Sequence, residues 1–141
     1  MGLFDGKKGL IIGVANDRSI ACAIAKRIMD EGGECGFTHL PDKPDDEKQK
    51  NRRRVARCTD GYENAKFLVP LDVRNDEQIA EVMAKTKDEF GAVDFLLHSV
   101  AFASLDDLKV DTIESSRDGF LLAMEISAYS LLAICTAAKE I

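Results

Sequence analysis

Short apolar runs recur along the chain, separated by longer segments in which apolar residues return every three or four positions. The runs cover residues 9–15, 35–38, 67–71 and 93–98. Each run is too short for a buried helix and is bounded by turn-forming residues, which is typical of a strand buried on both faces of a parallel sheet. The pattern therefore predicts four parallel strands.

The segment after the first run carries the signals of a helix. Ser19 is a good N-cap residue, and Gly32-Gly33 favours termination. Between them, apolar residues spaced by four indicate the helix face that we expect to be buried: Ile20, Ile24 and Ile28. A later helix has the same design, with Asn75 as its N-cap and Gly91 at its end. Its predicted inward side chains are Ile79, Val82, Met83 and Phe90.

Residues 41–66 are the most polar part of the chain. Three acids, Asp45–Glu47, precede a series of bases: Lys48, Lys50, Arg52, Arg53, Arg54 and Arg57. Acids first and bases last suit a helix dipole, so we expect a helix here. The bases form either a nucleic-acid patch or a solvated helix face. The excess of 25 acidic over 19 basic residues, a net charge of -6, favours the solvated face.

The last segment, after a loop from Ser99 to about Ser116, predicts a long helix through Ile141. Between Phe120 and Ala138 its only charged residue is Glu125. A helix that is apolar nearly all round must be covered by protein on several sides. It also reaches Ile141 without a glycine or a cap. We therefore expect the chain to be cut within a helix, with further strands and partner subunits missing.

Strands that alternate with helices at this spacing indicate the α/β class. We expect a Rossmann-type doubly wound parallel sheet, and right-handed crossovers give the strand order 3-2-1-4. A chain of 141 residues suits one domain, so we predict that residues 1–141 form a single dinucleotide-binding domain, truncated at its C-terminus.

Composition and the start of the sequence limit the possible partners and the cellular location of the protein. The acidic balance disfavours nucleic acid as a partner, and no unbroken run of about 18 apolar residues points to a membrane span. The start of the chain lacks the pattern of a signal peptide, so we expect a cytoplasmic protein. Its four cysteines contain no C-x-x-C pair and are expected to be reduced thiols, and no metal site is predicted. They are Cys22, Cys35, Cys58 and Cys135.

Gly13 is the first residue that indicates a ligand-binding function. It stands where the first strand meets the first helix, at the edge of a doubly wound sheet where dinucleotides bind. Amide N–H groups at Ser19 and Ile20 can face a pyrophosphate there. However, only this one glycine of the G-x-G-x-x-G pattern is present. The pattern alone leaves open a non-catalytic nucleotide-binding or interaction module.

Five ordered motifs carry a family resemblance. They are Gly13–Ala21, Gly36–Thr38, Leu71–Val73, His98–Ala103 and Ile126–Ser130, preceded by a similar Gly6–Lys8. The first resembles the stretched phosphate loop of the bacterial enoyl-(acyl carrier protein) reductases, a divergent branch of the short-chain dehydrogenase/reductases. The fourth stands where ordinary members of that superfamily carry Asn-Asn-Ala-Gly. The chain is similar to the N-terminal half of such an enzyme.

The resemblance implies a seven-stranded fold, of which four strands are present, and NADH-dependent reduction of a trans-2-enoyl thioester in fatty-acid biosynthesis. Hydride passes from NADH, leaving NAD, and a tyrosine stabilises the enolate. The thioester is carried on acyl carrier protein, and the enzyme is expected to be a homo-oligomer, a homotetramer in our prediction. The implied cofactor-binding residues are Gly13, Ser19, Ile20, Asp72, Val73 and Val100, and Ala103 borders the acyl site. Asp72 is expected to accept from the adenine amine.

Two departures affect the cofactor site. Leu40 replaces a polar residue near the adenosine ribose, so that contact is lost or supplied by His39 or Asp42. Without an arginine there to meet a 2′-phosphate, NADH is favoured over NADPH. Ala101 stands for the usual glycine and would narrow the site near the nicotinamide.

The third departure concerns catalysis. The family's Tyr-x6-Lys pair lies beyond the fifth strand, so we expect no catalytic residue in this chain and little activity from it alone. Tyr62 and Lys66 match a Tyr-x3-Lys pattern but stand before the third strand, and we interpret the match as coincidence. Tyr129 has no lysine at the required spacing and is expected to pack on the long helix. A superfamily member acting on a carbonyl is a further alternative, which His98–Val100 disfavours.

Overall fold

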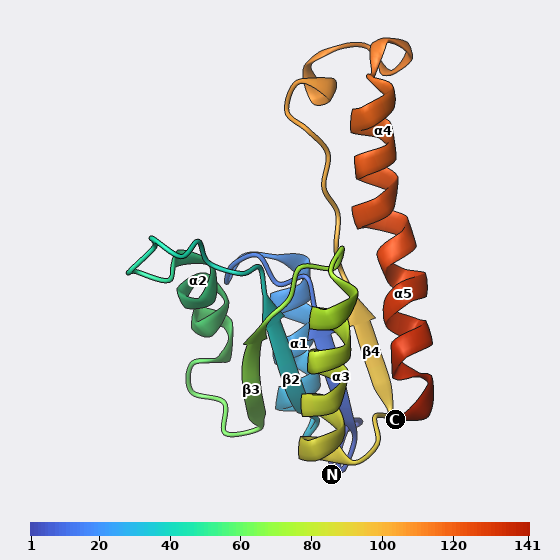
Figure 1. Cartoon of the computed structure of the whole chain (residues 1–141). Helices are drawn as coiled ribbons and strands as arrows, with labels where there is room; N and C mark the ends of the chain where they lie inside the picture. The colour runs from blue at the N-terminus through green and yellow to red at the C-terminus, as the bar shows by residue number, and fades with distance from the viewer.

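A computed structural model describes all residues, 1–141 (Figure 1). Its centre is one parallel sheet with the strand order β3-β2-β1-β4. The strands are β1 (Lys8–Ile12), β2 (Glu34–His39), β3 (Ala65–Pro70) and β4 (Phe95–His98). The predicted class, strand number and strand order are confirmed, with ends that differ from the apolar runs by a few residues.

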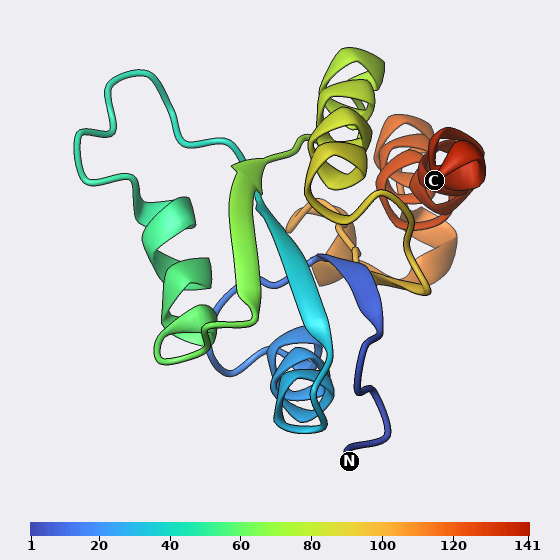
Figure 2. The same cartoon turned by 90° about the horizontal axis from the view of Figure 1, so that it is seen from below.

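Helices cover both faces of the sheet, as the view in Figure 2 shows. One face carries α1 (Ile20–Asp30) and α2 (Lys50–Thr59). The other carries α3 (Asp76–Phe90) and the last helical stretch, which contains α4 (Arg117–Met124) and α5 (Ser130–Ala137). Alternate residues of β1 enter the two cores: Ile11 faces α1, while Leu10 and Ile12 face α3. This two-sided burial explains why the strand is apolar without interruption.

The sequence placed the buried face of α1 incorrectly. Ile20 and Ile24 are 76% and 39% exposed, and only Ile28 of the three expected residues is buried. The residues that face the sheet are Ala21, Cys22, Ala25, Ile28 and Met29. These lie at positions i, i+1, i+4, i+7 and i+8, which is the usual apolar stripe of an amphipathic helix. The small side chains of this stripe let the helix approach the sheet closely, whereas a strict spacing of four drifts around the helix.

The helix α2 also begins later than the order of charges predicts. It starts at Lys50 after Gln49, whose φ of 46° is left-handed, so Asp45–Glu47 precede the helix rather than form its first turn. The exposed N-terminal amides are satisfied from outside, because the Asp42 carboxylate accepts from Asn51 N at 2.6 Å and Arg52 N at 3.2 Å. The bases of this segment are exposed.

The last helical stretch is not one regular helix. Residues Glu125–Tyr129 form a π-helical turn between α4 and α5, which the sequence did not predict. By length and composition alone, the stretch Arg117–Glu140 would suffice to cross a membrane, with a mean hydropathy of 1.8 and 11% of the apolar window buried. Figure 1 shows α4 and the preceding loop extending beyond the sheet. The loop contains two short 3-10 turns, Asp107–Lys109 and Thr112–Glu114, and a third, Ala138–Glu140, follows α5.

Two glycine–phenylalanine pairs align neighbouring strands. Gly9 of β1 pairs with Phe95 of β4, and Gly36 of β2 pairs with Phe67 of β3. A Cβ atom on Gly9 would lie 2.2 Å from the Phe95 ring, and one on Gly36 would lie 2.1 Å from the Phe67 ring. Each ring therefore occupies the space that a side chain on the paired strand would need.

The expectation of four free thiols is wrong for two cysteines. Cys22 of α1 and Cys58 of α2 form a disulfide, with their Cα atoms 5.7 Å apart. The reason is tertiary: both helices pack on the same face of the sheet, which brings together residues 36 positions apart in sequence. Cys35 is a buried free thiol, and burial raises its pKa to about 12. Cys135 is free and exposed.

Candidate functional site

A hollow of about 420 Å³ lies where the four strands end. All four loops after the strands contribute to its wall, together with Leu122 and Ile126 of the last helical stretch. The lining residues in these loops and at the strand ends are Ile12–Ala15, Thr38–Leu40, Leu71–Arg74 and Ser99–Phe102. This is the edge of a doubly wound sheet at which ligands bind. Four of the predicted cofactor residues meet here: Gly13, Asp72, Val73 and Val100.

Gly13 is required by its backbone and by its neighbour. Its φ of 102° lies in the region that favours glycine. A Cβ atom there would lie 2.1 Å from the Ser99 carbonyl oxygen. The loops after β1 and β4 therefore touch at this point, and Ser99 N donates to Ile12 O at 2.9 Å beside it. The glycine brings two walls of the hollow together as well as leaving space for a ligand.

The N-terminus of α1 has the geometry of a helix that can receive an anion. Ser19 is its N-cap, and the side chain accepts from Cys22 N at 3.3 Å and donates to Asn16 O at 2.8 Å. The first intrahelical bond runs from Ala23 N to Ser19 O, so the amide of Ile20 precedes it. Neither Ser19 nor Ile20 is among the residues that line the hollow; they stand at the far end of the β1–α1 loop.

Asp72 does not stand alone at the end of β3. Its carboxylate accepts from Arg74 Nη2 at 3.0 Å and from the Arg74 amide at 3.0 Å. These bonds to Arg74 hold the pKa of Asp72 below its ordinary value, so the group is an anion at neutral pH. Sequence reasoning missed Arg74, although its position two residues after Asp72 is a common spacing for such a turn.

His39 fixes the end of β2 with one nitrogen and leaves the other free. Its Nδ1 lies 2.8 Å from Leu40 O, which can only accept, so Nδ1 carries the proton. The Nε2 atom is then an acceptor, and it is buried without a partner. The carboxylate of Asp42 lies 3.9 Å from Nδ1. Asp42 itself is not among the residues that line the hollow, and the cation of the lining is Arg74.

The π-turn attaches the last helical stretch to the loop after β4. Ser127 Oγ accepts from Phe102 N at 3.0 Å and donates to Phe102 O at 3.2 Å. Ser130 Oγ donates to Ile126 O at 2.6 Å, so it accepts the Nε2 proton of His98 at 2.7 Å. Burial lowers the pKa of His98. The unpredicted turn thus places Ser127 against this loop, while Ser130 at the start of α5 bonds to His98 at the end of β4. Leu122 and Ile126 are part of the wall.

Ala103 borders a second, shallower hollow beside the first. Its lining residues are Ala101, Phe102, Ala103, Ala123, Met124 and Ser127. Phe102, which the sequence left open between core and wall, is half-exposed and belongs to both hollows. Ala101 also lines both.

The two tyrosines lie away from both hollows. Tyr62 donates to the Asp30 carboxylate at 3.0 Å, and Lys66 pairs with Glu34 at 3.4 Å, both near the starts of strands. The Tyr-x3-Lys match thus lies near the strand starts, away from the hollows at the strand ends. Tyr129 ends the π-turn and is mostly exposed. No group of three histidine, cysteine or acidic residues has the geometry of a metal site.

Comparison with known proteins decides between the candidate families. Residues 13–141 match the family model described as enoyl-(acyl carrier protein) reductase. The chain belongs to the enoyl-(acyl carrier protein) reductase family. The resemblance seen in the motifs is thereby confirmed.

Curated members of the enoyl-(acyl carrier protein) reductase family align along the whole chain. The enoyl-(acyl carrier protein) reductase (NADH) of Bacillus cereus is 39% identical over 141 residues, which is 100% of this chain and 53% of that protein. That of a Nostoc species is 40% identical over 136 residues, 96% of this chain and 51% of that protein. The chain spans about half the length of the curated relatives it matches.

Solved structures of the family show the same fold. The Anaplasma phagocytophilum reductase in complex with NAD has a TM-score of 0.86 at 37% identity, over 98% of this chain and 50% of that one. The Bacillus cereus reductase with NADP+ and indole naphthyridinone has a TM-score of 0.87 at 39% identity, over 100% of this chain and 52% of that one. The four-stranded half-sheet is thus the family's own arrangement.

Proposed function

We propose that the chain is the dinucleotide-binding part of an NADH-dependent enoyl-(acyl carrier protein) reductase of fatty-acid biosynthesis. The observation that carries the proposal is the hollow at the carboxyl edge of the sheet, which residues of the family's motifs line. Residues 1–141 would form this part as a single domain. The substrate is a trans-2-enoyl thioester on acyl carrier protein.

The residues fit a dinucleotide along the strand ends. The Gly13 loop and the amides near Ser19 and Ile20 would hold the pyrophosphate, since a helix N-terminus attracts anions. The Asp72 carboxylate, an anion with lone pairs left beside Arg74, would accept from the adenine amine, with Val73 and Val100 as apolar walls. Ala103, in the adjoining hollow, would border the acyl chain. Bound NADH supplies the hydride.

The wall beside β2 supports NADH rather than NADPH. The buried Nε2 of His39 has an unused lone pair, which suits a ribose hydroxyl better than a phosphate. Asp42 adds a negative charge beside His39, and Arg74, the cation of the lining, is already paired with Asp72, so a 2′-phosphate would find no unpaired cation there. We expect the protein to bind NADH at least tenfold more tightly than NADPH, an energy of about 1.4 kcal/mol.

We assign the stabilisation of the enolate to none of the residues 1–141. Neither tyrosine lines a hollow, and the exposed segment of α4 faces the second one. In this chain the residues bind and orient: Ser127 and Ser130 fix the loop after β4, and Leu122 and Ile126 exclude water from its inner side.

Assembly and location follow as part of the same proposal. The last helical stretch exposes a run of large apolar side chains, and such a surface marks an interaction site. They include Phe120, Leu121, Met124, Leu131 and Leu132. A homotetramer in the cytoplasm would cover them, and the docking of this helix on β4 through Ser130 supports a protein rather than a membrane partner. Size-exclusion chromatography with light scattering, without detergent, measures the assembly; a detergent requirement would contradict it.

The cofactor proposal is tested on the protein encoded by the whole reading frame. Calorimetric titration should give heat with NADH, and Asp72→Asn should weaken binding about tenfold or more, as loss of a charged hydrogen bond does. Asp88→Asn is the matched control, because Asp88 is exposed on α3, away from the hollow. Absence of NADH binding, or equal losses in the two variants, would refute the assignment.

Turnover separates the reaction from its alternatives. With NADH, the protein should reduce crotonyl thioester and leave a β-keto thioester unreduced. Faster reduction of the β-keto thioester would indicate a carbonyl-reducing member of the superfamily, and binding without any turnover would indicate a non-catalytic module.

A further inference from the structure

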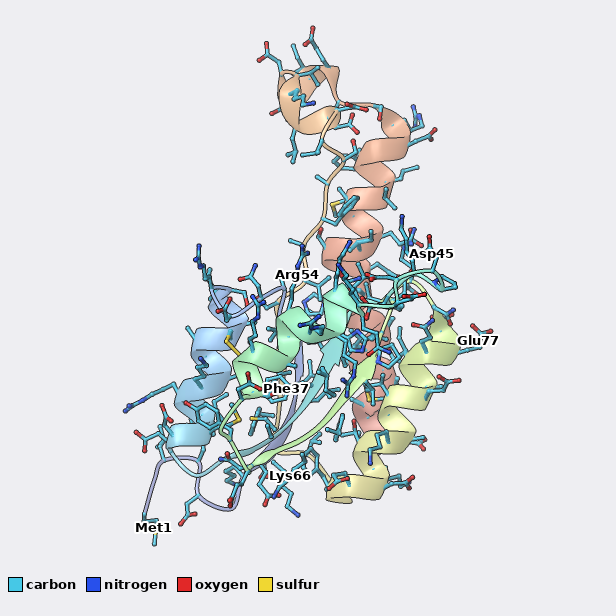
Figure 3. The ribbon with its side chains drawn as sticks, turned by 90° about the vertical axis from the view of Figure 1, so that its left-hand side faces the viewer. Met1, Phe37, Asp45, Arg54, Lys66 and Glu77 are labelled. Atoms are coloured by element: carbon cyan, nitrogen blue, oxygen red, sulfur yellow. A yellow bond between two sulfur atoms is a disulfide. The ribbon has the colours of Figure 1, made fainter.

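A covalent link joins α1, the helix that follows the β1–α1 loop, to α2. Cys22 lies in the first turn of α1 and Cys58 in the last turn of α2, and their disulfide is visible as a yellow bond between the two helices in Figure 3. Both residues are fully buried in the core under this face of the sheet. The link therefore sits beneath the loop that the proposed function assigns to the pyrophosphate.

On the α1 side, the disulfide begins at the N-cap. The amide of Cys22 donates to Ser19 Oγ, and Ser19 Oγ donates in turn to Asn16 O within the loop. The cap, the loop and the bridged residue thus form one hydrogen-bonded unit. A displacement of the Cys22 backbone changes the direction of the first-turn amides, which are the groups that would meet a phosphate.

On the α2 side, the disulfide is a main attachment of the helix. Val55 and Cys58 are its only buried residues, whereas its basic residues point to solvent. Its other end is held by Asp42, three residues after His39 in the wall of the hollow. The helix α2 therefore connects the β2 wall to the first turn of α1, and the disulfide is the covalent part of that connection.

We propose that Cys22 and Cys58 form a reversible thiol–disulfide exchange site, and that the disulfide form holds the first turn of α1 in its cofactor-binding geometry. The inference rests on the proposed function, since the coupled ligand is the dinucleotide. Reduction frees α2 and weakens binding of NADH.

The exchange needs a dithiol as co-reactant. Local opening of α2, the weakly held helix, exposes Sγ of Cys58 to a thiolate of the dithiol. That thiolate bonds to Sγ of Cys58, the bond between the two protein sulfurs breaks, and Cys22 leaves as a thiolate in the first turn of α1, where negative charge is favoured. The second thiol of the dithiol then displaces Cys58 and closes the reagent's own disulfide. Two electrons and two protons pass to the protein, and both cysteines end as thiols.

The other two cysteines, Cys35 and Cys135, do not compete in this exchange. Cys35 is buried with a pKa raised to about 12, so it holds its proton and is a poor nucleophile. Cys135 is exposed on α5, on the other face of the sheet from the disulfide. Alkylation under denaturing conditions followed by mass spectrometry should therefore find a Cys22–Cys58 disulfide before treatment and both residues alkylated after it.

The test compares NADH binding by the oxidised protein and by the same protein after dithiothreitol, using the whole reading frame. We expect reduction to raise the dissociation constant about tenfold, within the usual range of coupling between sites. Re-oxidation with oxidised dithiothreitol should restore it. Cys58→Ala should bind as weakly as the reduced protein and be insensitive to the reagent, whereas the control Cys135→Ala should respond like the parent.

Three outcomes would overturn the inference. Equal binding by the oxidised and reduced forms would refute it while leaving the proposed function standing. A dithiothreitol effect that persists in Cys58→Ala would assign the effect to another group. Absence of NADH binding in both forms would refute the inference together with the proposed function. The comparison within the unsubstituted protein needs no variant to fold.

Discussion

Replacing Gly13 by alanine tests the contact between two walls of the hollow. Two features disfavour a side chain at this position. The φ of residue 13 is 102°, and the added Cβ atom would lie 2.1 Å from Ser99 O and 2.4 Å from Ser99 C. Both are backbone atoms, so no side-chain rotation relieves the overlap. Ordinary contact begins at 3.4 Å, and reaching it requires the loops after β1 and β4 to separate.

The magnitude follows from these two effects. A left-handed conformation costs an alanine about 1–2 kcal/mol, and separating the loops breaks the bond from Ser99 N to Ile12 O, worth about 1 kcal/mol. We therefore expect Gly13→Ala to lower the free energy of unfolding by about 2–3 kcal/mol. Gly61→Ala is the matched control, because Gly61 has a φ of 83° and no atom within 4 Å of an added Cβ. Gly61→Ala should lower the free energy of unfolding only by the cost of the left-handed backbone conformation, about 1–2 kcal/mol.

Urea denaturation followed by circular dichroism measures both losses in the protein from the whole reading frame. The reasoning fails if Gly13→Ala costs no more than Gly61→Ala. Normal stability of Gly13→Ala combined with lost NADH binding would show that the glycine serves the ligand alone, and that the contact with Ser99 is dispensable.

Three further predictions concern single groups. Because burial lowers the pKa of His98 from 6.5, the unfolded chain binds more protons, so stability should fall as the pH drops below 6.5, and His98→Gln should flatten this slope in denaturation curves. The hydrogen bond from Lys7 is the main cause that lowers the pKa of Asp94 from 3.8. The contribution of Asp94 to stability should therefore be present above pH 3.8 and vanish as the pH falls through the lowered pKa, and Asp94→Asn should not show this loss. Ser127→Ala removes both bonds to Phe102 and should cost about 1 kcal/mol of stability and weaken NADH binding; an unchanged dissociation constant would contradict the positioning role.

Local signals were sufficient for the arrangement of the sheet. The first two apolar runs form largely buried strands, and the third and fourth form partly buried ones. The caps at Ser19 and Asn75 and the end at Gly91 are satisfied within a few residues of themselves. For the same reason the strand ends, and with them Gly13 and Asp72, could be placed at one edge before any coordinates. The strand order then follows from right-handed connections.

The missed features depend on contacts between distant segments. Arg74 is the exception, because it stands two residues after Asp72 and its local signal was overlooked. The π-turn, in contrast, places Ser127 against Phe102 and is followed by Ser130, which bonds to His98 at the end of β4. The disulfide of Cys22 and Cys58 requires two helices to share a face. No spacing within one segment predicts such partners.

The glycine–phenylalanine pairs limit how the strands can slide. If β4 moved by one residue along β1, the Phe95 ring would meet Leu10 instead of the bare backbone of Gly9, and β3 would meet a similar obstacle at Cys35. Each phenylalanine ring fits only opposite a glycine, which has a hydrogen atom where other residues have a side chain. Two of the three strand pairs are thereby held in register, β4 against β1 and β3 against β2, and so are the loops that follow them.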